Sequence, residues 1–393
     1  MIRLFINGLA ASAGGGLTYL RNVVPHLSRR LDVETTVLLS PSMRAELGAL
    51  PNVELLEDAT TTSAGLRFLH EQSVLPKLIR RYGADVLLCA GNFALWRSPV
   101  PQILLSRNSL YTSADFFCDV RARKDYSIWA DTRVKAWFAR QSLKRADITV
   151  APSAAFAHEL SQWSGREVLA VHHGFDSDSF TNDETPLPQN VQAKIQDEED
   201  TFRLLFVSHY NYYRNFETLF RAMSVLRNRL ALRKVKLFLT CFLSSGANPG
   251  SYRTKSAASL ANNLRQNHDI VELGPVPYRS LHHLYRACQI YVTPAYAESF
   301  AHPLIEAMSS GLPIVASDLP VHREICGDAA LYFPRFSPDL LAARVLEISE
   351  QPQLSEELSR KGVQRARDFS WSDHVERLIQ LANGLVQAKR KQS

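Results

Sequence analysis

Two carboxylates stand eight positions apart around the start of a predicted helix. Glu298 falls in a loop, and Glu306 falls one turn inside the helix that we expect over 303–309. Pro303 suits the first helical position, where its missing N–H needs no partner, and Gly311 suits a left-handed stop. The free N–H groups at this helix start favour a phosphate. The pattern is typical of a sugar-nucleotide site, although two exposed acids on an ordinary helix are the alternative.

Three glycines, Gly14, Gly15 and Gly16, separate the first predicted strand from the first predicted helix. Such a turn lets the backbone approach a ligand closely and directs N–H groups at an anion. The spacing is neither G-x-G-x-x-G nor a Walker loop, so it predicts no dinucleotide or P-loop site. A flexible turn is the alternative. We favour the functional interpretation, because ordering three glycines costs conformational entropy, and a function would explain why they are present.

A second cluster follows the strand predicted at Arg203–Val207. His209 comes just after this strand, and Arg214 comes just before the next predicted helix. Two side chains that can carry positive charge are able to neutralise a departing diphosphate in place of a metal. An ordinary surface loop rich in aromatic residues is the alternative.

Short apolar runs alternate with helical patterns along both halves of the chain. Such alternation predicts βαβ units and doubly wound parallel sheets, so the fold class is α/β. Strands are expected at Arg3–Asn7, Glu34–Leu39, Val53–Leu56, Val86–Cys89, Gln102–Ser106, Ile148–Ala151, Val168–Val171, Arg203–Val207, Lys236–Thr240, Ile270–Leu273, Ile290–Thr293, Ile314–Ala316 and Ala330–Phe333. Helices are expected at Leu17–Leu31, Leu66–Arg81, Arg133–Arg145, Ala154–Trp163, Glu217–Leu230, Ser256–Gln266, Ser280–Arg286, Pro303–Ser309, Leu340–Ile348 and Ser355–Arg367.

The pattern breaks once, in a segment with two prolines and an acidic run. This divides the sequence into a Rossmann-like domain over 1–176, a linker over 177–201, a second Rossmann-like domain over 202–369, and a helix with a basic tail over 370–393. Ligands of such sheets bind beyond the carboxyl ends of the strands, so we expect the two domains to face a central cleft. We expect the last helix to cross back to the first domain.

Composition excludes several classes of protein. Apolar residues make up 46% and charged residues 21% of 393 residues, which is typical of a soluble globular protein. The five cysteines show no C-x-x-C spacing, which favours a reducing compartment over a zinc site or a disulfide scaffold. The first apolar run is too short for the core of a signal peptide, and no run approaches the roughly 20 apolar residues of a membrane span. A cytoplasmic protein without a nucleic-acid-binding module is therefore expected.

The net charge of +6 is concentrated between residues 121 and 145. This stretch carries eight basic residues, Arg121, Arg123, Lys124, Arg133, Lys135, Arg140, Lys144 and Arg145, with Trp129, Trp137 and Phe138 among them. One interpretation is a face that meets anionic lipid headgroups or an acidic acceptor, which would place the protein peripherally on a membrane. The other is a solvated helix face. We expect the aromatic side chains to belong to the core.

Taken together, these elements resemble the retaining glycosyltransferases of family 4, which have the GT-B fold. The resemblance covers nearly the whole chain and is strongest from Arg203 to Phe333. It implies that Glu298 binds hydroxyls of the donor sugar and Glu306 those of the ribose. It also implies that Ser299, Phe300, Ala301 and His302 lie near the diphosphate together with Gly14–Gly16, and that Arg214 replaces the usual lysine.

Three departures from the family pattern affect the expected site. Ser208-His209 stands where Gly-Arg is common. Either His209 supplies the positive charge, through a pKa raised by the diphosphate, or one positive charge is missing. Ala301 stands where glycine is common, which would narrow the pocket. The first domain lacks the family's usual loop histidine, so Arg107 or Asn108 would act on the acceptor side.

The resemblance implies an enzyme that needs no metal or other cofactor. It would move a hexosyl unit, with retention, from a UDP- or GDP-linked sugar to an acceptor hydroxyl on a saccharide or lipid-linked molecule. Cell-surface polysaccharide or glycolipid assembly is the expected setting. Two alternatives stay open: a nucleotide-sugar epimerase of the same fold, and a nucleotide-sugar-binding protein without catalysis.

Overall fold

The computed structural model describes residues 1–10, 15–59, 64–196, 201–229, 234–243 and 255–392. Its contacts divide the chain into two compact units. Unit 1 consists of Met1–Thr112, Ser127–Gly174 and Ser370–Ser393, and unit 2 of Ser113–Tyr126 and Phe175–Phe369. The sequence placed Ser113–Tyr126 inside a continuous first domain, whereas the contacts place this segment in unit 2. The acidic run 197–200 lies outside the described residues.

Unit 1 is built on a parallel sheet with strand order β3-β2-β1-β4-β5-β6-β7. The strands are β1 (Ile2–Asn7), β2 (Val33–Leu39), β3 (Val53–Glu57), β4 (Val86–Cys89), β5 (Gln102–Leu105), β6 (Ile148–Ala151) and β7 (Leu169–Ala170). The central strands β4 and β5 are buried at every position, as expected for strands covered on both faces. The order reverses between β1 and β4, which pair directly.

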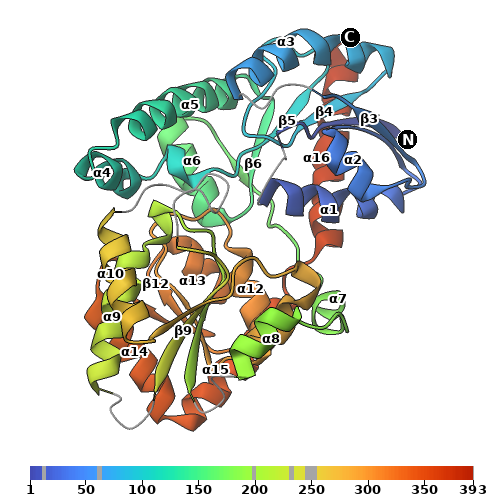
Figure 1. The fold of residues 1–393 in the computed structure, drawn as a ribbon. Coiled ribbons are helices and arrows are strands. Elements are labelled where there is room, and N and C mark those ends of the chain that lie inside the picture. The colour runs from blue at the N-terminus through green and yellow to red at the C-terminus, as the bar shows by residue number, and fades with distance from the viewer. Residues whose placement is uncertain (11–14, 60–63, 197–200, 230–233, 244–254, 393) are drawn as a thin grey trace. The chain divides into compact units, whose positions relative to one another are not determined.

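Helices cover this sheet (Figure 1). They are α1 (Gly15–Ser28), α2 (Pro41–Leu47), α3 (Ala64–Arg81), α5 (Tyr126–Arg145), α6 (Ala154–Ser164) and α16 (Trp371–Gln392), with the 3-10 helix η1 at Ser109–Tyr111. Figure 1 shows the red α16 among the blue elements from the chain's beginning. The predicted return of the last helix to the first domain is therefore confirmed.

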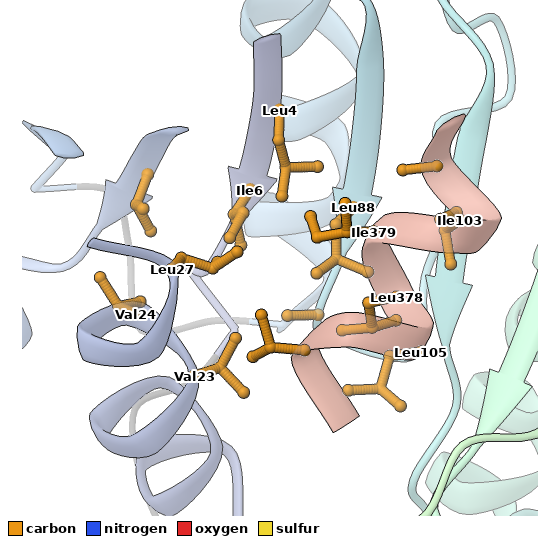
Figure 2. Close-up of a cluster of buried hydrophobic side chains, with 14 of the residues drawn as sticks. Leu4, Ile6, Val23, Val24, Leu27, Leu88, Ile103, Leu105, Leu378 and Ile379 are labelled. Carbon is orange, nitrogen blue, oxygen red and sulfur yellow. The ribbon is translucent and has the colours of Figure 1, made fainter. Parts of the chain in front are cut away.

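The core of unit 1 explains why α16 returns. Figure 2 shows apolar side chains from β1, α1, β4, β5 and α16 pointing toward one another. Leu378 and Ile379 of α16 pack there against residues nearly 300 positions earlier in the chain, such as Leu88. Where the chain approaches α16, Gly174 is required, because a Cβ atom there would lie 2.0 Å from the backbone nitrogen of Trp371.

Unit 2 has a second parallel sheet, with order β10-β9-β8-β11-β12-β13. The strands are β8 (Phe202–Phe206), β9 (Val235–Leu239), β10 (Ile270–Glu272), β11 (Ile290–Thr293), β12 (Ile314–Ser317) and β13 (Ala330–Phe333). The helices are α4 (Ala114–Ala122), α7 (Ser177–Thr181), α8 (Gln189–Gln196), η2 (Tyr212–Arg214), α9 (Phe216–Arg229), α10 (Lys255–Gln266), η3 (Tyr278–Ser280), α11 (Leu281–Arg286), α12 (His302–Ser309), α13 (Pro320–Cys326), α14 (Pro338–Glu350) and α15 (Pro352–Ala366). Two doubly wound α/β units confirm the predicted fold class.

The sequence pattern missed several helices. It predicted only Arg133–Arg145 of α5, which begins at Tyr126, and it predicted no helix at α2, α4 or α13. Helices α2, α4 and α13 have only seven to nine residues each, too few to show a clear helical period. The expectation that the aromatic residues of α5 are core residues is wrong for Trp137, whose side chain is 53% exposed.

The structure also describes the state of the cysteines and the apolar character of the helices. All five cysteines are free thiols, and each except Cys118 is buried. Among the helices in the described part of the chain, none combines the length and the apolar character needed to cross a membrane.

Candidate functional site

The predicted donor-site residues follow two neighbouring strands of unit 2. Strands β8 and β11 pair directly at the point where the strand order reverses, with Leu204 opposite Ile290. The loop after β8 carries His209 and Arg214, and the loop after β11 carries Glu298. The carboxyl ends of strands at such a reversal are the usual ligand position in open α/β sheets. Residues more than 80 positions apart in the sequence are therefore brought to one place.

Arg214 and Glu298 form a direct ion pair in which the guanidinium donates to Oε1 of the carboxylate. The two side chains are 19% and 11% exposed, so water screens the pair only weakly. The guanidinium also lies 4.9 Å from the ring centre of Tyr213. The family resemblance implied that both residues serve one site, and the geometry places them in contact.

This pairing keeps Arg214 firmly charged. Burial acts to lower the pKa of the guanidinium, but the Glu298 carboxylate and neighbouring tyrosines leave the pKa above its usual value. Within the described part of the chain, Nε of Arg214 is buried without a hydrogen-bond partner. Arg214 therefore offers a positive charge and an unused N–H donor beside a carboxylate.

Two hydrogen bonds to backbone carbonyl oxygens hold the two loops together. The amide of Asn215 donates from Nδ2 to the carbonyl oxygen of Pro294 over 3.1 Å. The N–H of Tyr296 donates to the carbonyl oxygen of Tyr213 over 3.0 Å. Asn215 has a left-handed φ of 55°, which asparagine tolerates well. The bond from Asn215 to the second loop had no signal in the sequence.

Glu306 lies on α12 and is almost completely buried, at 6% exposure. Its Oε2 accepts a hydrogen bond from the Tyr285 hydroxyl over 2.8 Å. Burial raises the pKa of this carboxyl to about 7, although the bond from Tyr285 acts to lower it. Tyr285 belongs to a helix that the sequence predicted, but nothing in the pattern marked it as a partner of the second glutamate.

The charges of Arg214, Glu298 and Glu306 all act on one buried side chain, that of Tyr291. The Tyr291 hydroxyl on β11 experiences the charges of Arg214, Glu298 and Glu306. Burial is the main reason why the pKa of Tyr291 lies well above its usual value, while Arg214 lowers it and the two glutamates raise it. The two glutamates and the arginine therefore lie within electrostatic range of the same buried hydroxyl.

The segment between the glutamates has unusual backbone geometry. Ala301, directly before α12, adopts φ 59° and ψ 61° in the left-handed region. Phe300 is buried, and its ring stands edge-on to His302 at 4.8 Å. Ser299 lies in the same turn, which leads into the helix start. The geometry explains why glycine suits position 301: the constraint is the backbone conformation rather than pocket width alone.

Ala301→Gly is expected to raise the free energy of unfolding by up to about 1 kcal/mol. The left-handed conformation costs alanine about 1–2 kcal/mol, and glycine's greater freedom in the unfolded chain offsets about half of that. Urea unfolding measures the change. Ala343→Gly inside α14 is the control, since glycine there should lower stability by about 1 kcal/mol. A lower stability for Ala301→Gly would contradict the strain argument.

His209 lies on the surface of the same region. Partial burial of the ring, followed by the charge of Arg214, lowers its pKa from the ordinary value. In the ligand-free protein His209 is therefore mostly neutral at pH 7. The positive charge that the sequence assigned to it requires an anion that raises the pKa again.

Unit 1 brings the other predicted residues together. Gly14 lies outside the described residues, whereas Gly15 and Gly16 begin α1. Arg107 donates to the carbonyl oxygens of Gly15, over 2.7 Å, and of Ala90, over 2.6 Å. It thereby ties the loop after β1 to the loop after β4 at the reversal of strand order.

Arg107 and Asn108 both have structural contacts of their own. The Arg107 guanidinium lies 5.3 Å from the ring centre of the buried Tyr19, and burial lowers the pKa of Arg107 to about 10. The Asn108 side chain accepts a hydrogen bond from the N–H of Leu110 over 3.1 Å and caps η1. An acceptor-side role for either residue stays a prediction.

Comparison with known families assigns both halves of the chain. The family described as glycosyl transferases group 1 matches residues 189–365. The family described as glycosyltransferase family 4 matches residues 13–179. The chain belongs to the family 4 glycosyltransferases. The predicted family is therefore confirmed.

Curated relatives carry glycosyltransferase names. An O-antigen chain mannosyltransferase B of Escherichia coli is 35% identical over 26% of this chain and 26% of its own length. A D-inositol 3-phosphate glycosyltransferase of Corynebacterium aurimucosum is 26% identical over 62% of this chain and 58% of its own. One from Catenulispora acidiphila is 24% identical over 99% of this chain and 96% of its own. The first two matches thus span less than two thirds of those proteins.

Solved structures show the same fold. A sucrose-phosphate synthase from Thermosynechococcus elongatus has a TM-score of 0.75 at 17% identity, covering 99% of this chain and 100% of its own. HepE of Anabaena in complex with UDP-glucose has a TM-score of 0.72 at 16% identity, covering 98% and 100%. At these identities the similarity establishes the GT-B architecture.

Proposed function

We propose that this protein is a retaining glycosyltransferase that moves a hexosyl unit from a UDP- or GDP-linked sugar to an acceptor hydroxyl. The ion pair of Arg214 and Glu298 at the carboxyl ends of β8 and β11 carries the proposal. When a sugar diphosphate binds, the ion pair can open, so that the cation and the carboxylate bind different parts of the ligand. Phosphate oxygens take the guanidinium, and the released carboxylate accepts hydrogen bonds from sugar hydroxyls.

The chemistry follows from this division. The bond between the sugar's anomeric carbon and the β-phosphate oxygen breaks, and a bond to the acceptor oxygen forms on the same face. The acceptor's proton passes to the departing phosphate oxygen, so no side chain needs to act as base. Arg214, the start of α12 and His209, once protonated, stabilise the charge that develops on the diphosphate.

We further propose that the reaction needs no metal. The positive charge of Arg214 can neutralise the diphosphate in place of a bridging cation. Transfer rates in the presence of EDTA should equal those with added Mg²⁺. A rate that depends on Mg²⁺ would contradict this part of the proposal.

A thermal-shift screen against UDP, GDP, ADP and their sugars identifies the donor. A ligand at 100 times its dissociation constant stabilises the native state by about 2.7 kcal/mol and raises the melting temperature. The donor found in this way is then incubated with and without acceptors. Transfer with unchanged anomeric configuration supports the proposal, and complete epimerisation without acceptor supports an epimerase. The absence of any shift would favour a protein without nucleotide-sugar affinity.

Apolar and basic side chains on unit 1 favour an acceptor at a cytoplasmic membrane surface, as in cell-surface polysaccharide or glycolipid assembly. Leu66 and Leu69 on α3 and Val134 and Trp137 on α5 are each more than half exposed. The two helices meet where the Phe68 and Phe138 rings lie 5.2 Å apart. Arg133, Arg140 and Lys144 on α5 are also exposed. Such a surface suits anionic headgroups.

The double variant Leu69→Ser/Trp137→Ser is expected to bind vesicles of mixed neutral and anionic phospholipid at least about tenfold more weakly than the unchanged protein. Vesicle sedimentation measures the binding. Leu340→Ser on α14 is the matched control, since Leu340 is an exposed leucine of unit 2. Equal binding by all three proteins, or none by the unchanged protein, would overturn this surface as a membrane contact.

A further inference from the structure

The segment Ser113–Tyr126 packs in one unit while both of its ends continue into the other. It follows β5 and precedes nearly all of α5, which belong to unit 1, yet its own contacts place it in unit 2. Most of the segment is the helix α4, which begins with Ser113 as its cap. Its polar side chains contact both loops of the candidate donor site.

The first set of contacts reaches the loop that carries Arg214. The Tyr212 hydroxyl donates to Oδ2 of Asp125 over 3.1 Å. The Arg123 guanidinium lies 4.9 Å from the ring centre of Tyr212 and donates to Oε1 of Glu217 over 2.5 Å. Tyr212 and Arg214 are the two ends of η2, so these contacts fix the turn that presents Arg214.

The second contact reaches the loop that carries Glu298. The Tyr296 hydroxyl donates to Oδ2 of Asp119 over 2.7 Å, and Tyr296 stands two residues before Glu298. The other oxygen of Asp119, Oδ1, accepts from Nε of Arg123 over 2.8 Å. One carboxylate and one guanidinium therefore connect the two loops through side chains of a third segment.

These hydrogen bonds are strong enough to fix the spacing between the loops that carry Arg214 and Glu298. The side chains of Asp119, Arg123 and Glu217 are only 17–21% exposed. Charge-assisted hydrogen bonds that are partly shielded from water are stronger and shorter than neutral ones. A displacement of about 1 Å between catalytic groups is enough to cost much of their effect, so the spacing of the two loops matters for the chemistry.

We propose that residues Ser113–Tyr126 form a strap that sets the position of Arg214 against Glu298. Asp119 and Arg123 are its positioning residues. Asp119 accepts the hydrogen bond from Tyr296 on one loop, and Arg123 packs on the ring of Tyr212 on the other. This proposal rests on the proposed function, because the strap would hold Arg214 and Glu298 at the spacing that binding of the donor diphosphate and its sugar requires.

Tyr296→Phe and Arg123→Met test the strap. Tyr296→Phe removes a single oxygen. Arg221→Met is the matched control for Arg123→Met, since Arg221 is an exposed arginine of α9 in the same unit. Calorimetry measures the dissociation constants of UDP, GDP and ADP, and kinetics give kcat/KM for the donor, both at 25 °C below the melting transition. Tyr296→Phe and Arg123→Met should each weaken diphosphate binding and lower kcat/KM by about fivefold to twentyfold.

The control variant should stay within about twofold of the unchanged protein, and Arg123→Lys should recover part of the loss. A merely structural role would lower the melting temperature of Tyr296→Phe and Arg123→Met but leave the affinity of the native protein unchanged. Affinity and kcat/KM within twofold in both variants would overturn the strap alone. Binding of no nucleoside diphosphate by the unchanged protein would overturn the proposed function and the strap with it.

Discussion

Glu298→Gln should lower turnover by about 100-fold or more while the protein stays folded. The carboxylate is expected to hold the donor sugar as positive charge develops at the anomeric carbon, and removing one such electrostatic contact costs about 100- to 1,000-fold in turnover. Glutamine keeps the shape and an acceptor oxygen for Arg214, so the unfolding free energy should fall by only about 1–2 kcal/mol. Steady-state kinetics with the identified donor measure the effect.

Glu356→Gln provides the control for this variant. Glu356 is an exposed glutamate of α15 in the same unit, so its change alters net charge equally without touching the site. Its turnover should match that of the unchanged protein. If Glu298→Gln turned over within about threefold of the unchanged protein, the assignment of Glu298 would be wrong.

Glu306→Gln should stabilise the protein above neutral pH and weaken donor binding. Burial raises the pKa of this carboxyl from 4.5 to about 7. Below pH 4.5 the carboxyl is protonated in both the folded and the unfolded chain. As the pH rises from 4.5 to about 7, the unfolded chain releases the proton first, so stability is progressively lost. By pH 8 the loss is about 3 kcal/mol, and glutamine, which does not ionise, avoids it.

Urea unfolding of both proteins between pH 4 and pH 8 tests this expectation. The difference in unfolding free energy between Glu306→Gln and the unchanged protein should grow by about 3 kcal/mol across that range. Glu71 in unit 1, whose pKa burial also raises to about 7, is present in both proteins, so its contribution cancels. A difference that is constant with pH would show that Glu306 does not titrate as proposed.

The trade-off at Glu306 has a physical reason. A carboxyl with a raised pKa costs stability at neutral pH, so its burial beside Tyr285 suggests a task other than folding. We expect that task to be the ribose of the donor. The affinity of Glu306→Gln for the nucleoside diphosphate should accordingly fall by about tenfold.

Local chemistry determined much of what could be predicted. The apolar strands, the two α/β repeats and the break between them follow from periodicity, which depends on neighbours a few residues apart. The glutamate spacing across the start of α12 was also readable, because Pro303 and Gly311 mark the helix by their backbone preferences; Gly311 indeed has a φ of 72°.

Tertiary structure alone decided the remaining features, because each depends on residues that only folding brings together. The pairing of β8 with β11 joins Arg214 to Glu298. Glu306 receives its hydrogen bond from Tyr285 of α11, and the strap depends on a segment whose contacts lie in the other unit. Sequence patterns report which side chains are present and which face of an element they occupy. Distances, ionisation and partners across the fold arise from packing, which no short-range pattern encodes.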